Sequence, residues 1–117
     1  MAERSDRSLE LEAQQRGAAS VVYVRGSAGM SEADKLRGAL ETLTRQKALP
    51  IVLELTDMDF ICSAGLGAII YGHLKCRHYQ GQIKLVSPRP AVRELLETTR
   101  LTKLFTLYDS VEDALGQ

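Results

Sequence analysis

Two side chains of the nucleophilic type stand next to each other at Cys62 and Ser63, and the first histidine of the chain follows at His73. Nucleophilic catalysis needs a base within hydrogen-bond reach of the nucleophile and a third group that orients the base. If the residues after Ser63 form a helix, His73 lies roughly 15 Å along its axis, because each residue advances the axis by about 1.5 Å. No Asp in the sequence is evidently placed to orient His73. We therefore predict that the protein is not an enzyme.

A second set of residues, His73, Cys76 and His78, has side chains that can ligate metals. His73 and Cys76 are three positions apart and could share one face of a helix, whereas His78 is five positions from His73 and points elsewhere. Two ligands do not make a zinc site. We predict no metal here, and interpret the pair as a partly buried histidine and cysteine on a helix.

The segment Gly65-Leu66-Gly67 resembles part of a dinucleotide fingerprint, but the full pattern needs a third glycine, and position 70 is Ile. We expect no cofactor, and attribute the glycines to a sharp turn and a helix start that packs close to the sheet. Asp57 and Asp59 are interpreted as turn residues. Glu54, inside an apolar run, is expected to face a polar partner or solvent, because an unpaired buried charge is costly.

Ser63 itself has two interpretations. An apolar run over residues 51–55 precedes it, and an apolar-striped segment reaching about Tyr79 follows it, so Ser63 stands where a buried strand leads into a helix. A serine just before a helix can cap it by accepting a hydrogen bond from the first-turn N–H groups. The same N–H groups and the helix dipole would also stabilise a phosphate. The residues alone leave open whether Ser63 is a cap or a phosphorylation switch.

The elements that must position these residues follow from hydrophobic periodicity. Period-two alternation and short apolar runs predict strands, and apolar residues spaced by three and four predict helices. The order β-β-α-β-α-β-α-β-α predicts a single α/β domain with a mixed, mostly parallel sheet of about five strands, four helices and an opening β-hairpin. Strands are expected at residues 9–14, 19–25, 51–55, 83–86 and 105–108, and helices at 31–47, 63–79, 90–99 and 111–115.

Local signals mark the ends of these elements. Residues 26–30 are expected to form a loop, and Ser31 to open a capping box for the first helix. Residues 57–59 are expected to connect the third strand to the second helix. Gly81 is expected to end that helix, and Ser110 to cap the last one.

The bulk properties narrow the class of protein further. The chain has 117 residues, which is one domain, with residues 1–7 expected to be a flexible N-terminus and residues 8–117 the folded part. Fifteen basic and fifteen acidic residues cancel, so we expect no nucleic-acid partner. No apolar run approaches the roughly 20 residues of a membrane span, so direct membrane insertion is not expected. Without an export signal, the two cysteines are expected to be reduced in a cytoplasmic protein.

The segments from Ile51 to Thr56 and from Phe60 to Gly67 together resemble the signature of STAS domains, whose best-known members are bacterial anti-sigma factor antagonists. The resemblance extends over about residues 8 to 116, because the element order and the later segment from Ile83 to Pro88 also fit. In the family, the first serine of the pattern Asp-Ser-Ser/Thr-Gly is phosphorylated, and Ser63 aligns with it. Three features depart from the family pattern: Cys62 replaces the usual Asp, Ala64 replaces the second Ser or Thr, and Glu54 and Ser31 stand where Asp is frequent.

The resemblance implies a binding function. The unphosphorylated protein would bind an anti-sigma factor that is also a serine kinase and so release a sigma factor, and phosphorylation of Ser63 would end the binding. A serine phosphatase as a second partner and a homodimer are compatible with this scheme. The alternatives are a STAS scaffold or regulatory subunit of a stress-signalling or transporter-associated assembly, or a small nucleotide-binding module. The partner-binding surface is expected at Met58, Ile61, Cys62, Ser63, Ala64, Gly65, Leu66 and Gly67.

Overall fold

A computed structural model describes residues 8–116 of the chain, so the flexible N-terminus predicted for residues 1–7 lies outside the described residues. The elements follow the predicted order, with two short 3-10 turns added. They are β1 (Glu10–Arg16), β2 (Ala19–Ala28), η2 (Met30–Glu32), α1 (Ala33–Arg45), β3 (Ile51–Ile61), α2 (Ser63–Arg77), β4 (Ile83–Val86), α3 (Pro90–Thr98), η3 (Leu101–Lys103), β5 (Leu107–Tyr108) and α4 (Val111–Gly116).

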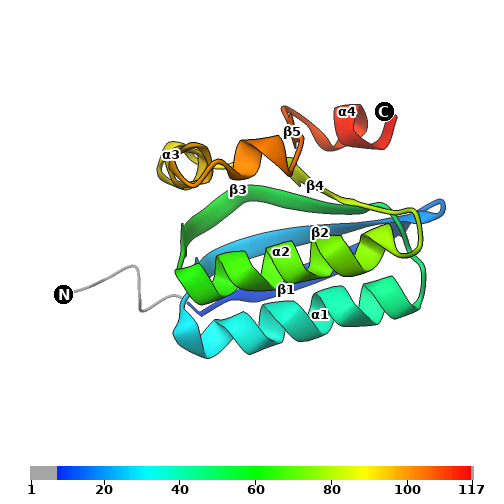
Figure 1. Cartoon of the computed structure of the whole chain (residues 1–117), viewed down its shortest axis with the longest axis horizontal. Helices are drawn as coiled ribbons and strands as arrows, with labels where there is room; N and C mark the ends of the chain where they lie inside the picture. Colours follow the sequence, from blue (N-terminus) through cyan, green and yellow to red (C-terminus); the bar gives the residue numbers. More distant parts are fainter. Residues whose placement is uncertain (1–7, 117) are drawn as a thin grey trace.

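The five strands form one sheet in the order β1-β2-β3-β4-β5. β1 and β2 are an antiparallel hairpin, and the remaining neighbours pair in parallel. The predicted α/β domain with a mixed, mostly parallel sheet is therefore confirmed. α1 and α2 run side by side along one side of the sheet, whereas α3, β5 and α4 lie beyond β3 and β4 (Figure 1).

Alternating residues of the central strands supply two separate apolar clusters. In β2, Val22 belongs to the larger cluster and Val21 to the smaller one, and in β3 Leu53 and Val52 divide in the same way. This division follows from the period of two in a strand, which sends successive side chains to opposite faces. The larger cluster includes the inner faces of α1, α2 and α3, and the smaller one includes the inner face of α4. Both faces of the sheet are therefore covered.

β2 and β3 are longer than their apolar runs predicted. β2 continues to Ala28 and β3 to Ile61. The first three residues of the loop predicted at residues 26–30, and the whole connection predicted at residues 57–59, are therefore strand. The parallel pairing passes through two register shifts, after which Ala28 lies opposite Ile61. Gly26 lies at the second shift. It has φ +92, and a Cβ there would lie 2.2 Å from the Ser8 carbonyl oxygen, so only glycine fits this position.

The ends of the helices also differ in detail from the prediction. α1 follows the 3-10 turn, and the Glu32 carboxylate accepts a hydrogen bond from the Gly29 N–H at 3.2 Å, so Ser31 does not open the capping box. After α2, which ends at Arg77, Gln80 and not Gly81 takes the left-handed conformation, with φ +62. Gly81 is needed for space instead, because a Cβ there would lie 2.5 Å from Leu49. Ser110 caps α4 as predicted, accepting from the Asp113 N–H at 3.0 Å.

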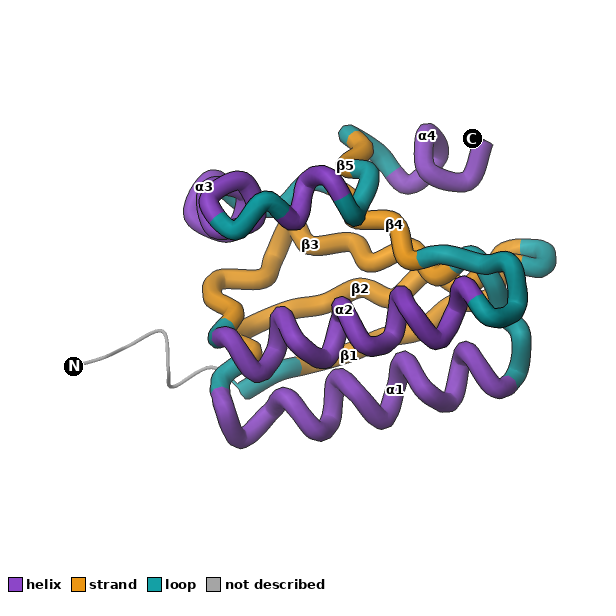
Figure 2. The backbone as a smooth tube through the Cα atoms, in the orientation of Figure 1, coloured by secondary structure: helices purple, strands orange, loops and turns teal. Residues whose placement is uncertain are grey.

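This arrangement fixes where the candidate residues lie. The junctions β2–η2 and β3–α2 are at one end of the molecule, and the α2–β4 turn lies at the opposite end beside the β1–β2 turn (Figure 2). The residues at the start of α2 are thus separated from those near its end by the length of the helix.

Candidate functional site

The junction between β3 and α2 is held to the sheet by the backbone of Cys62. The Cys62 N–H donates to the Ala28 carbonyl at 2.9 Å, and its extended conformation, with φ −89 and ψ 175, makes it the residue that precedes the helix. The Cys62 side chain makes no capping hydrogen bond, although the Cys62 carbonyl accepts the first helical bond, from Leu66 N–H at 3.0 Å. Ser63 is therefore the first residue of α2, so of its two interpretations the one as a helix cap is wrong.

The start of α2 consequently presents polar groups to solvent. Ser63 is exposed, and Leu66 is the first residue whose N–H is taken by a helical carbonyl. The N–H groups ahead of Leu66 belong to the first turn, where an α-helix leaves donors without intrahelical partners and where its dipole favours negative charge. An exposed hydroxyl thus lies beside a set of backbone donors that no Cys62 side-chain cap occupies.

The residues expected to bind a partner divide into a covered and an open group. Met58 is 1% exposed, Ile61 3% and Leu66 8%, and Gly65 is also buried. Because these residues are covered by the domain itself, the expectation that they contact a partner directly is corrected: they support the surface from below. Ser63 and Gly67 are exposed, and Cys62 and Ala64 are half-buried.

Gly65 and Gly67 have different roles although they are two positions apart. A Cβ at Gly65 would lie 2.7 Å from the Ile61 Cγ1 and 3.4 Å from the Ala28 carbonyl oxygen, so the close approach predicted for the helix start is confirmed there. A Cβ at Gly67 would have no neighbour within 4 Å. Gly67 instead forms part of a hollow of about 430 Å³ between α1 and α2, which Arg37, Glu41, Ala64 and Tyr71 also line.

Exposed apolar and charged groups surround the start of α2. Met30 of η2, which contacts α2, is 75% exposed, and Phe60 near the end of β3 is 37% exposed. Asp59 pairs with Arg89 at 3.4 Å, so it is not the turn residue that we expected, and neither is Asp57, because both lie within β3. The surface around Ser63 therefore combines large apolar side chains with backbone donors, a composition typical of protein interfaces.

His73 and Cys76 lie far from this surface and have partners of their own. His73 is 4% exposed, and its Nδ1 accepts a hydrogen bond from the Ile83 N–H at 3.1 Å. Its ring packs edge-on against the ring of Phe105, with the two ring centroids 4.9 Å apart. Burial, and then the charge of Arg77, lower the pKa of His73. Cys76 is buried with its Sγ 3.4 Å from the Thr44 Oγ1, and burial raises the pKa of its thiol. The interpretation of this pair as packed helix residues is confirmed.

The other candidate groups are also accounted for. His78 is exposed, and within residues 8–116 no three His, Cys, Asp or Glu side chains are placed to share a metal ion. Glu54 accepts hydrogen bonds from both the backbone N–H and the hydroxyl of Thr56, which is the polar partner predicted for it.

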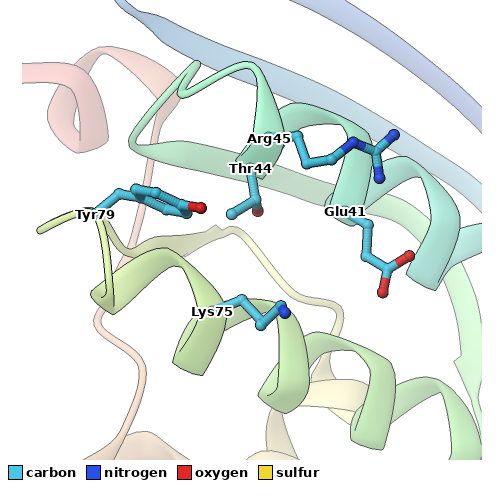
Figure 3. Close-up of a pocket in the computed structure, with 6 residues that line it drawn as sticks. Glu41, Thr44, Arg45, Lys75 and Tyr79 are labelled. Carbon is cyan, nitrogen blue, oxygen red and sulfur yellow. The ribbon is translucent and has the colours of Figure 1, made fainter.

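A second hollow between α1 and α2, of about 150 Å³, is lined by Glu41, Thr44, Arg45, Gly72, Lys75 and Tyr79 (Figure 3). Its charged side chains come from both helices.

Comparison with known proteins agrees with this geometry. The family model described as the STAS domain matches residues 10–114. The chain belongs to the STAS family. This STAS domain is 27% identical over 111 residues to the anti-sigma F factor antagonist of Paenibacillus polymyxa, covering 94% of this chain and 95% of that protein.

Solved structures show the same fold. A crystal structure of an anti-sigma factor antagonist from Mycobacterium paratuberculosis is 28% identical, with a TM-score of 0.83 over 93% of this chain and 92% of that one. The anti-sigma factor antagonist SpoIIAA in its unphosphorylated form is 20% identical, with a TM-score of 0.78 over 92% of this chain and 93% of that one. Its phosphorylated form has a TM-score of 0.71 at 19% identity, over 93% and 97% of the two chains. None of the helices in residues 8–116 of the STAS domain is long and apolar enough to cross a bilayer.

Proposed function

We propose that this STAS domain is an anti-sigma factor antagonist of the cytoplasm that acts by binding rather than by catalysis. Its partner would be an anti-sigma factor that is also a serine kinase, and binding would release a sigma factor. The relatives named as anti-sigma factor antagonists support this proposal, because one of them matches nearly the whole chain. A serine phosphatase would restore the unphosphorylated form.

The switch in this proposal is Ser63, and the observation that carries it is the exposed position of Ser63 as the first residue of α2. A kinase can reach this hydroxyl without unfolding the domain. The Ser63 side chain is also not a cap, because Cys62 occupies the position before the helix and its side chain makes no capping hydrogen bond. Phosphorylation of Ser63 therefore removes no hydrogen bond on which the start of α2 depends.

The phosphate would act through charge at the centre of an interface. It adds about −1.5 to −2 charges at neutral pH. The first-turn N–H groups of α2 can stabilise that charge within the domain, so the fold survives the modification. A partner that covers Ser63 would have to desolvate the same charge and make room for it, which weakens the complex.

The partner surface in this proposal consists of the exposed residues around Ser63. Met30 and Phe60 supply apolar area. The small side chain of Ala64 and the absence of one at Gly67 leave the hollow between α1 and α2 open to a side chain of the partner. Cys62 and Ala64 alter the family pattern beside the switch, and the exchange of Asp for Cys62 removes a charge that a kinase could read. We therefore expect a kinase adapted to this loop rather than one shared with all relatives.

Affinity capture from the native lysate tests the proposal. Wild type, Ser63→Ala and Ser63→Asp are used in parallel, with Ser110→Ala as a control for a serine that caps a helix elsewhere. Wild type, Ser63→Ala and Ser110→Ala should retain an ATP-binding serine kinase, and Ser63→Asp should lose it. Incubation of the captured kinase with wild type and ATP should then place one phosphate on Ser63 by mass spectrometry. Equal capture by wild type and Ser63→Asp would contradict the switch.

A further inference from the structure

The far end of α2 holds a buried histidine with one nitrogen unaccounted for. His73 is 4% exposed, and its Nδ1 accepts a hydrogen bond from the Ile83 N–H at 3.1 Å. A ring nitrogen that accepts a hydrogen bond carries no proton, so the neutral ring is protonated at Nε2, which is then a donor. Burial and the charge of Arg77 lower the pKa of His73 and so favour this neutral form.

The Nε2 donor faces a hollow. Within residues 8–116, no side-chain nitrogen or oxygen that is shut off from solvent lacks a hydrogen-bond partner. The bond to Ile83 occupies Nδ1 alone, and no described residue accepts from Nε2, so Nε2 must reach solvent. His73 lines a hollow of about 400 Å³ at the end of α2, so the Nε2–H can donate to a molecule bound in this hollow. The other residues that line the hollow are Arg77, Gln80, Gly81, Gln82 and Leu104.

The surroundings of this hollow are basic and rich in donors. A neighbouring hollow of about 320 Å³ shares the turn from Gln80 to Gln82 and is also lined by Lys47, Tyr79 and Lys84. No Asp or Glu lines either hollow. The residues around this turn thus carry an imidazole N–H, a guanidinium, two side-chain amides and an ammonium. These donors can bind an acceptor with negative charge.

The turn after α2 gives the last helical carbonyls backbone partners. The Cys76 carbonyl accepts from the N–H groups of Tyr79 and Gly81, both at 2.9 Å. The Arg77 carbonyl accepts from Gln80 at 3.1 Å, and the Lys75 carbonyl accepts from His78 at 3.1 Å. These bonds satisfy the carbonyls that a helix end otherwise leaves open.

We propose that the hollow bounded by His73, Arg77 and the turn from Gln80 to Gln82 binds a small phosphate monoester. The His73 Nε2–H and the Arg77 guanidinium hold the phosphate oxygens, and the space of about 400 Å³ accommodates the organic group that the phosphate carries. A phosphate is favoured over a carboxylate because it carries more charge and more acceptor oxygens for the donor residues that line the hollow. This site is at the other end of α2 from Ser63 and does not depend on the function proposed for Ser63.

The test uses the full chain, labelled with ¹⁵N, and a titration with glycerol phosphate. A long-range ¹H–¹⁵N spectrum of the free protein should show His73 protonated at Nε2 only. Glycerol phosphate should shift that Nε2 signal together with the backbone amides of residues 80–83, and acetate at the same concentration should shift them less. Arg77→Gln should weaken the apparent affinity by about tenfold or more, because it removes a charge-assisted hydrogen bond.

Arg93→Gln is the matched control, because Arg93 is an exposed arginine on α3 that pairs with Glu97 at 3.5 Å, outside both hollows. It should bind glycerol phosphate as wild type does. The site is ruled out if Arg77→Gln and wild type titrate alike, if the free His73 is protonated at Nδ1, or if acetate shifts the signals as strongly as the phosphate. Arg77 is exposed, so its substitution tests the site without the loss of packing that a change at His73 would bring.

Discussion

The two ends of α2 carry similar kinds of side chain but use them in opposite ways. At the start, Ser63 is exposed and the Cys62 side chain makes no capping bond. Towards the end, His73 is buried with a backbone partner, and Cys76 is buried beside Thr44. Reactive side chains therefore indicate function where they are exposed to solvent. Where they are buried and hydrogen-bonded within the domain, they indicate stability.

The largest expected effect is the loss of the buried histidine. His73→Ala should lower the free energy of unfolding by about 3 kcal/mol, because it leaves a cavity beside Phe105 and an unsatisfied N–H at Ile83. Urea denaturation followed by circular dichroism measures this change. His78→Ala, at the exposed residue that follows α2, should change stability by less than about 0.5 kcal/mol. Equal effects of the two substitutions would mean that His73 is not part of the packed core.

The two glycines at the start of α2 should respond with opposite signs. Gly65→Ala should destabilise by about 1–3 kcal/mol, because its Cβ would lie 2.7 Å from Ile61 and force that side chain to move. Gly67→Ala has open space and should stabilise by up to about 1 kcal/mol, since alanine is the better helix former. Thermal unfolding of the two variants compares them directly. A stabilising Gly65→Ala would show that the helix start is not packed tightly against β3.

Acid should act on the buried end of α2 through His73. Its pKa in the folded protein is lowered, so between that value and the ordinary value of about 6.5 the unfolded chain binds more protons than the folded one. Stability should therefore fall as the pH drops from about 7 through the folded pKa, while His73 contributes no pH dependence above about pH 7.5. The groups that face the ring are Arg77, Phe105 and the Ile83 backbone.

Urea midpoints measured between about pH 5 and 8 test this dependence. His73→Gln removes the titrating group and should flatten the dependence below about pH 7, whereas His78→Gln should leave most of it in place. A His73→Gln profile that matches wild type would assign the acid sensitivity to carboxylates instead.

The smallest expected change is at Ser63 itself. Ser63→Ala should alter stability by less than about 0.5 kcal/mol, because Ser63 is the first helical residue and not the cap. Ser110→Ala should cost about 1 kcal/mol, because the Ser110 hydroxyl accepts the Asp113 N–H at 3.0 Å. Chemical denaturation of the pair separates a capping serine from an exposed one. A larger loss at Ser63 than at Ser110 would restore the capping interpretation.

Much of this fold could be predicted, because the periodicity of the sequence reflects burial directly. Val21 and Val22, like Val52 and Leu53, pack on opposite faces of the sheet, as two adjacent residues of a buried strand must. The length of β3 could not be predicted, because Asp57 and Asp59 have turn-forming side chains, and only the pairing with β2 keeps this segment extended. Local propensity was overruled by a partner strand.

The sequence predicted that Ser63 lies where a strand leads into a helix, but not which residue begins the helix or which neighbours are buried. Whether Ser63 caps α2 or begins it is a difference of one residue, and it is decided by the extended conformation of Cys62, whose N–H is held by Ala28. Met58 and Ile61 are buried because of the same long pairing of β2 with β3. Their apolar character alone is equally compatible with a buried core position and with an exposed interface. Met30 and Phe60 were missed as surface residues, since Met30 fell in the predicted loop and Phe60 between the predicted connection and the predicted helix.

The central claim is that a phosphate on Ser63 blocks an interface centred on the start of α2. Isothermal titration of the captured kinase with unphosphorylated protein and with protein fully phosphorylated at Ser63 tests it most directly. The account predicts at least about tenfold weaker binding after phosphorylation, because the added charge must be desolvated in the complex, with the circular dichroism spectrum unchanged. Equal affinity of the two forms would contradict it.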